Sequence, residues 1–194
     1  SGKPSARKRK KKSAPTRSRW SEEAPVKILV IGATSFWGFP LVEELDRRGH
    51  KVSVFSRDPR RFPDRWRSHL RCIFGEISHA HILHEAIEGV DRVVASLSPG
   101  SNPDKAEGIE VGGIRSILET ATRIGKADLV RLTTPSPLRQ ADWWQMAVRR
   151  RADLIAETAG IPCCLAEMGW APEMLEPLRK GDTLWLPHPR SAPG

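Results

Sequence analysis

The 194-residue sequence has no tyrosine, few cysteines and no acidic residue in its first twenty positions. Without tyrosine, no mechanism can use a phenol as the proton donor. Cys72, Cys163 and Cys164 are too few, and odd in number, for a disulfide framework, and their apolar contexts indicate buried thiols in a reducing compartment. No segment approaches the roughly eighteen consecutive apolar residues of a membrane-spanning helix, so no span is expected.

The positive charge is concentrated at the N-terminus. The chain has 32 basic and 23 acidic residues, and nine of the basic ones lie within residues 1–20, which leaves the remainder balanced at 23 against 23. A neutral body is not a general nucleic-acid-binding face, so contact with a polyanion should run through the N-terminal segment. We call residues 1–24 the basic arm.

The basic arm has no apolar periodicity and is predicted to be disordered when free. Three interpretations stay open: a solvated tail or tag remnant, an arm that binds RNA or an acidic surface through residues 3–19, and a targeting signal. An intracellular, reducing location is expected, with a mitochondrion or chloroplast favoured over the nucleus or cytoplasm. A protein complex is the expected setting.

The segment from Lys27 to Asp58 organises the rest of the chain, because it has the pattern of one βαβ unit. A β-branched apolar run ends at Gly32, which indicates a strand buried on both faces of a parallel sheet. Helical periodicity follows from Phe36 to Arg48, and extended alternation returns from Lys51 to Phe55. Residues Pro59 to Arg67 are expected to form a short basic connection.

The turn between the first strand and helix, Gly32-Ala33-Thr34-Ser35-Phe36-Trp37-Gly38, resembles a dinucleotide-binding turn. Such a turn uses glycine for the tight bend, for close approach to the pyrophosphate and for helix–strand packing. Ser35 occupies the middle position, where its Cβ narrows the approach while its hydroxyl and the helix N-terminus supply donors. Arg57 stands where NAD-specific proteins place an acid, and a cation there suits a 2′-phosphate. A βαβ unit that binds nothing remains the alternative.

Histidines occur at positions 79, 81 and 84 of a predicted helix, and His81 and His84 share one face. Nothing supplies a third ligand at comparable spacing, so no metal site is predicted.

The chain resembles the NmrA-like atypical short-chain dehydrogenase/reductases over about residues 26 to 186. The resemblance rests on GATSFWG at residues 32–38, Arg57-Asp58-Pro59, Gly75-Glu76-Ile77 and the AIEGVDRVV stretch at residues 86–94. It implies a dinucleotide cofactor, with NADP(H) preferred and a vestigial site as the alternative. The candidate cofactor-binding residues are Gly32, Thr34, Ser35, Phe36, Trp37, Gly38, Arg57 and Ser98.

The same resemblance implies a catalytic serine after the fifth strand and a Tyr-x-x-x-Lys on the next helix. This chain has no tyrosine, and Arg149 or Arg150 falls near the lysine position. Arginine stays protonated and cannot act as a tunable acid. No catalytic residue is therefore assigned, and Thr133, Ser136 and Arg149 are weak candidates.

We expect residues 25–194 to form a doubly wound parallel α/β sheet of about six strands in the order 3-2-1-4-5-6, without a full C-terminal substrate lobe. A long helix is expected from Asp104 to Ile124, and an edge strand at residues 182–186. The favoured function is a catalytically degenerate NAD(P)-binding-fold protein acting as an accessory or scaffolding subunit of an assembly. The alternatives are an NADP-dependent oxidoreductase with an atypical site and an NADPH-sensing regulator.

Overall fold

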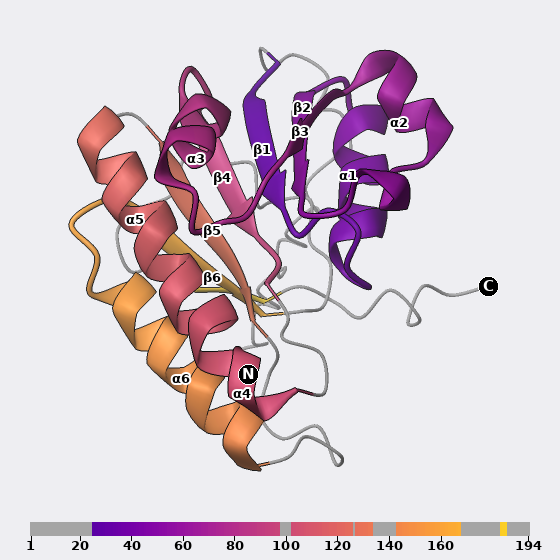
Figure 1. Cartoon of the computed structure of the whole chain (residues 1–194). Coiled ribbons are helices and arrows are strands. Elements are labelled where there is room, and N and C mark those ends of the chain that lie inside the picture. The colour runs from indigo at the N-terminus through magenta and orange to yellow at the C-terminus, as the bar shows by residue number, and fades with distance from the viewer. Residues whose placement is uncertain (1–24, 98–101, 126, 134–142, 168–182, 186–194) are drawn as a thin grey trace, which may run out of the picture.

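The computed structural model describes residues 25–97, 102–125, 127–133, 143–167 and 183–185. A single parallel sheet runs through the middle of the molecule, with strands in the order β3-β2-β1-β4-β5-β6-β7 (Figure 1). The predicted doubly wound fold and its strand order are confirmed, with the predicted edge strand as the seventh. The strands are β1 Lys27–Ile31, β2 Lys51–Ser56, β3 Arg71–Phe74, β4 Arg92–Ala95, β5 Asp128–Thr133, β6 Cys163–Glu167 and β7 Thr183–Trp185.

Helices cover both faces of this sheet (Figure 1). Helices α1 and α2 lie on one side, and α3, α5 and α6 lie on the other. The helical elements are α1 Gly38–Arg47, the 3-10 turn η1 Pro59–Arg61, α2 Asp64–His69, α3 Ala80–Ile87, α4 Pro103–Ala106, the π-helical segment η2 Glu107–Gly112, α5 Gly113–Ile124 and α6 Trp143–Glu157.

Strand β1 shows why the chain folds into three layers. Its side chains alternate between two separate cores: Leu29 and Ile31 pack in the cluster beneath α3, α5 and α6, while Ile28 and Val30 pack with α1 and α2. All four are almost completely buried. Because both faces of β1 are buried, its sequence is apolar throughout and does not alternate, as expected of a central parallel strand.

Two predicted segments differ from the structure. Residues 59–67, predicted as a connection, contain η1 and the start of α2, because Trp66 is buried against Phe39 and Phe62 and anchors a helix there. The long helix expected after residue 103 is present, but its middle turns are π-helical.

The prediction of buried thiols is confirmed for Cys163 and only in part for Cys72. Cys163 is buried and Cys72 is half-buried, and neither is in a disulfide. Burial raises the pKa of the Cys72 thiol, so the thiolate is disfavoured at neutral pH. Within the described ranges, none of the helices combines the length and apolar character that crossing a bilayer requires.

Candidate functional site

The glycine turn lies where β1 ends, at the carboxyl edge of the sheet and beside the end of β4. Gly32 has φ 79°, and a Cβ built on it would lie 2.1 Å from the carbonyl oxygen of Ser96. A Cβ on Gly38 would lie 2.2 Å from the Gly32 carbonyl oxygen. Both glycines are therefore needed for the bend and for the close packing of α1, as predicted.

We expect Gly32→Ala to lower the free energy of unfolding by about 2–4 kcal/mol, since it combines a left-handed backbone with a steric clash. Gly49→Ala is the matched control, because Gly49 has φ 81° and open space around it. Its cost should stay near 1 kcal/mol. Urea unfolding of both variants measures the difference, and equal losses would show that the contact with Ser96 is unimportant.

Ser35, at the middle position of the turn, has a structural role as a hydrogen-bonding residue. Its Oγ accepts a hydrogen bond from the Gly38 amide at 2.9 Å and shares another with the Ser96 hydroxyl at 2.7 Å. The side chain thus joins the turn to the end of β4. It also occupies one donor of the α1 N-terminus that a phosphate would otherwise use.

The turn still offers donors to a phosphate. Among the described residues, no acceptor is found for the backbone amides of Thr34 and Phe36, which precede α1. The positive end of the helix dipole points the same way. Arg61 reaches over the turn, with its Nη2 3.4 Å from the Thr34 carbonyl oxygen. This arrangement of amides and a cation fits a pyrophosphate.

The predicted aromatic residues of the turn form a pair. The Phe36 and Trp37 rings meet edge to face with centroids 5.1 Å apart, and Phe36 is 63% exposed. An exposed ring beside the phosphate donors can cover one side of a bound cofactor. Their contact with a ligand stays a prediction.

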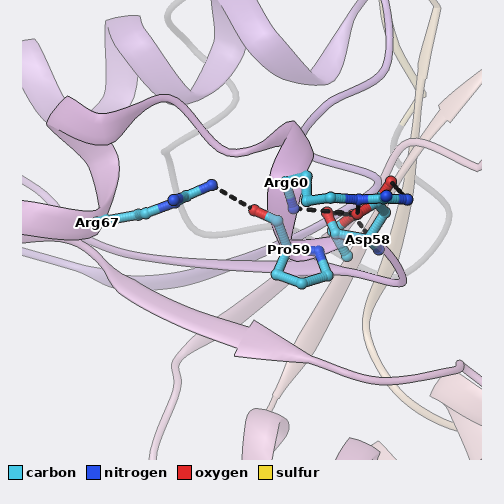
Figure 2. Close-up of polar contacts among 5 residues, drawn as sticks. Asp58, Pro59, Arg60 and Arg67 are labelled. Atoms are coloured by element: carbon cyan, nitrogen blue, oxygen red, sulfur yellow. Dashed lines mark hydrogen bonds and ion pairs between the residues drawn. The ribbon is translucent and has the colours of Figure 1, made fainter.

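Arg57 follows β2 directly and is exposed, and no ion pair engages it in the described part of the chain. The adjacent carboxylate, Asp58, is already occupied: its Oδ1 accepts from the Arg60 amide and Nε, each at 3.0 Å, and its Oδ2 accepts from Arg60 Nη2 at 3.2 Å (Figure 2). The Arg60 guanidinium holds the pKa of Asp58 below its usual range. Asp58 therefore caps the 3-10 turn η1, and Arg57 is the exposed cation at the end of β2.

The loop that carries Arg60 is fixed from its other side. Arg67, in α2, donates from Nη2 to the carbonyl oxygen of Pro59 at 2.8 Å (Figure 2). The segment after β2 is thus held by contacts within itself and with α2.

The candidates for chemistry at the other half of the site are only partly described. Thr133 is the last residue of β5, while Ser98 and Ser136 lie outside the described residues. Arg149, in α6, places its Nε 3.5 Å from the Glu110 Oε1. Its guanidinium is thus beside a buried carboxylate, where it completes an ion network.

That network was not predicted from the sequence. Arg131, from the middle of β5, is 1% exposed and donates from Nη2 to Glu110 at 2.8 Å and from Nε to Asp153 at 2.6 Å. Glu110 comes from the π-helical segment η2 and Asp153 from α6. Glu110 Oε1 and Arg131 Nη1 have no hydrogen-bond partner there. The sequence signal that could have revealed the network is a charged residue, Arg131, inside the otherwise apolar stretch Leu129-Val130-Arg131-Leu132.

Curated relatives match part of the chain. It is 29% identical over 127 residues to sterol-4-alpha-carboxylate 3-dehydrogenase, decarboxylating, of Bos taurus, covering 63% of this chain and 35% of that protein. It is 28% identical over 109 residues to 3 beta-hydroxysteroid dehydrogenase/Delta 5-->4-isomerase of Mycobacterium tuberculosis, covering 51% of this chain and 29% of that protein. The chain thus spans about a third of each relative's length.

Solved structures share the fold. The Bordetella bronchiseptica enzyme WbmG in complex with NAD superposes with a TM-score of 0.63 at 18% identity, covering 76% of this chain and 54% of that one. A nucleoside-diphosphate-sugar epimerase of Staphylococcus aureus gives 0.62 at 18% identity, covering 78% and 53%.

The family itself is identified by its sequence model. The model of the NAD(P)H-binding family matches residues 32–156, which is more than half of the chain and includes the glycine turn. A nucleotide cofactor at this edge of the sheet agrees with the donors described above. The chain therefore belongs to the NAD(P)H-binding family, in keeping with its resemblance to the NmrA-like short-chain dehydrogenase/reductases.

Proposed function

We propose that this protein binds NADP(H) and acts as a catalytically degenerate subunit of a larger assembly. The observation that carries the cofactor choice is the pair Arg57 and Asp58: the cation is unpaired among the described residues, and the carboxylate is held by Arg60. A 2′-phosphate gains a cation here, whereas a 2′-hydroxyl finds no carboxylate ready to accept its hydrogen bond.

The degenerate part of the proposal rests on α6. If Arg149 stands at the family's lysine position, Gln145 stands at the tyrosine position, and neither side chain can give and take a proton near neutral pH. Arg149 also sits beside the buried carboxylate of Glu110. Losing a positioned acid–base pair typically costs 10²–10⁴-fold in rate.

We expect NADPH oxidation by the purified protein to stay below about 1 s⁻¹ with quinones, aldehydes and ketones, near the low end of ordinary enzymes. The assay follows NADPH absorbance with the isolated chain and with the assembly purified from its source. Calorimetry with NADPH is run in parallel, because it distinguishes a protein that does not bind NADPH from one that binds NADPH without oxidising it. Substrate-dependent turnover above that rate would overturn the degenerate role.

A second function is an NADP-dependent oxidoreductase with an atypical site. It is favoured by the curated relatives, two of which carry dehydrogenase in their names. In that case a hydroxyl near the end of β5, Thr133 or Ser136, would take the place of the phenol. Loss of turnover in Thr133→Val or Ser136→Ala would support this alternative.

A further inference from the structure

Ser35 uses hydrogen-bonding capacity that a phosphate would otherwise meet at the glycine turn. Its Oγ accepts from the Gly38 amide at 2.9 Å and lies 2.7 Å from the Ser96 hydroxyl, so both groups are engaged within the protein. In a turn with glycine at this position, the first amide of the helix would be free to face a phosphate. This turn therefore offers one donor fewer than the glycine pattern provides.

Arg61 supplies a cation at the same turn. Its Nη2 donates to the carbonyl oxygen of Thr34 at 3.4 Å, across 27 positions of the sequence. This distance exceeds the usual 2.7–3.2 Å of such hydrogen bonds, so the contact is a weak one. A guanidinium has five N–H donors, and most of those of Arg61 stay available to a ligand. The turn thus has a replacement for the donor that Ser35 occupies.

The backbone of Arg61 is anchored on both sides. Its amide donates to the carbonyl oxygen of Asp58 at 3.2 Å, which closes the 3-10 turn η1. The next residue, Phe62, is 2% exposed, and its ring centroid lies 6.1 Å from that of Trp66 and 5.4 Å from that of Phe74. The Arg61 side chain therefore extends from a fixed point, and a change of rotamer is enough for it to meet a ligand at the turn.

The carboxylates of the adjoining helical segments do not neutralise Arg61. Glu43 of α1 pairs with Arg65 at 2.8 Å, and Asp58 pairs with Arg60 at 3.0 Å. Within the described ranges, no carboxylate forms an ion pair with Arg61. The N-terminal end of a helix is equivalent to about half a positive charge, whereas a pyrophosphate brings two negative charges. A cation at the turn is therefore needed to balance the ligand.

We propose that Arg61 binds the pyrophosphate of the dinucleotide and replaces the amide donor that Ser35 occupies. The inference rests on the proposed cofactor binding and identifies the residue that makes a serine at the middle position compatible with it. On binding, the guanidinium exchanges its weak contact with the Thr34 carbonyl for hydrogen bonds to a charged phosphate, which are shorter and roughly twice as strong as neutral ones. Arg57 and Arg61 then serve different phosphates of one ligand.

The test measures the affinity of the full chain for ADP-ribose, NADH and NADPH by calorimetry. All three ligands carry the pyrophosphate, and NADPH alone carries a 2′-phosphate. Arg61→Ala is compared with Arg57→Ala. The matched control is Arg123→Ala, which removes one exposed cation from α5. Thermal melts check that all variants are folded.

We expect Arg61→Ala to weaken the binding of all three ligands by about tenfold or more, because each loses the same charge-assisted hydrogen bonds. The ratio of NADPH affinity to NADH affinity should therefore stay within about threefold of wild type. Arg57→Ala should weaken NADPH selectively, since only NADPH has the phosphate assigned to Arg57. Arg123→Ala should change each affinity by less than about threefold, because a distant exposed charge is screened by salt.

The variant Ser35→Ala tests the replacement of the donor directly. It removes the hydroxyl that accepts from the Gly38 amide, so that this amide can face the phosphate again. In this background we expect Arg61→Ala to cost no more than about threefold, because the freed amide takes over part of its role. The four chains, wild type, each single variant and the double variant, form a double-mutant cycle that measures the coupling.

Three outcomes would overturn the inference while the proposed cofactor binding stands. They are an unchanged affinity for ADP-ribose in Arg61→Ala, a loss confined to NADPH, and equal losses from Arg61→Ala with and without Ser35→Ala. A wild-type chain that binds none of the three ligands would refute the inference together with the proposed function. A wild type that prefers NADH, combined with equal losses for all ligands in Arg61→Ala, would support the role of Arg61 and contradict only the choice of NADP(H).

Discussion

Replacing Glu110 by alanine is expected to lower the free energy of unfolding by about 3–5 kcal/mol, the range measured when one partner of a buried ion pair is removed. The Arg131 guanidinium is 1% exposed and would keep Asp153 as its one close carboxylate in the described network. A cation that is neither hydrated nor fully paired is costly in a protein interior. Asp153→Ala should act in the same direction.

Arg151→Ala is the matched control for this prediction. Arg151 pairs with Glu107 across the same two elements, α6 and η2, but both side chains are more than half exposed. Exposed pairs contribute about 0–1 kcal/mol, so this variant should be close to wild type. Urea unfolding measures all of them. Equal losses for Glu110→Ala and Arg151→Ala would show that burial does not increase the contribution of the network to the free energy of unfolding.

A triple variant distinguishes the cost of leaving one buried charge unpaired from the net contribution of the whole network to stability. Arg131→Met combined with Glu110→Leu and Asp153→Leu removes the three most buried charges of the network and leaves Arg149, whose side chain is 23% exposed. Apolar replacement of buried ion networks is often neutral or stabilising. We therefore expect it to be more stable than Glu110→Ala alone. A greater loss in the triple variant would mean that the apolar side chains do not pack in the space that Arg131, Glu110 and Asp153 occupy.

The parts of the fold that follow from local sequence were predictable. The apolar run before Gly32, the helical stripe after it and the return to extended residues define β1, α1 and β2, because each pattern is set by neighbouring residues. The strand order follows from right-handed crossovers and from the family resemblance. The turn glycines were predictable for the same reason, since their role depends on backbone geometry that glycine alone permits.

The interior polar groups and the helix after β2 were not predictable in this way. Arg131, Glu110 and Asp153 are distant in sequence, and no local pattern states that three separate elements bring them together. In the sequence, Trp66 lies among basic residues and resembles part of a surface connection. Its burial depends on contacts with Phe39 and Phe62, which only the structure shows. Likewise, the role of Asp58 became clear only when its carboxylate was found with Arg60.

Calorimetry should show that NADPH binds more tightly than NADH and that Arg57→Asp reverses this order. Hydrogen bonds to charged groups contribute about 1.5–3 kcal/mol, so loss of Arg57 alone should cost NADPH about 10- to 150-fold. The new carboxylate would repel the 2′-phosphate and accept a hydrogen bond from the 2′-hydroxyl of NADH. Arg60→Ala offers an independent route, because it releases Asp58 and should raise NADH affinity.

Arg123→Asp is the control, since it makes the same charge change on an exposed position of α5 and no ion pair engages Arg123 among the described residues. It should leave the NADPH-to-NADH ratio within about threefold, because a distant exposed charge is screened by salt. If wild type prefers NADH, or if Arg57→Asp and Arg123→Asp change the ratio equally, Arg57 does not select the cofactor. A change confined to Arg57→Asp and Arg60→Ala would place the choice at the end of β2, where the unpaired cation and the occupied carboxylate lie side by side in sequence.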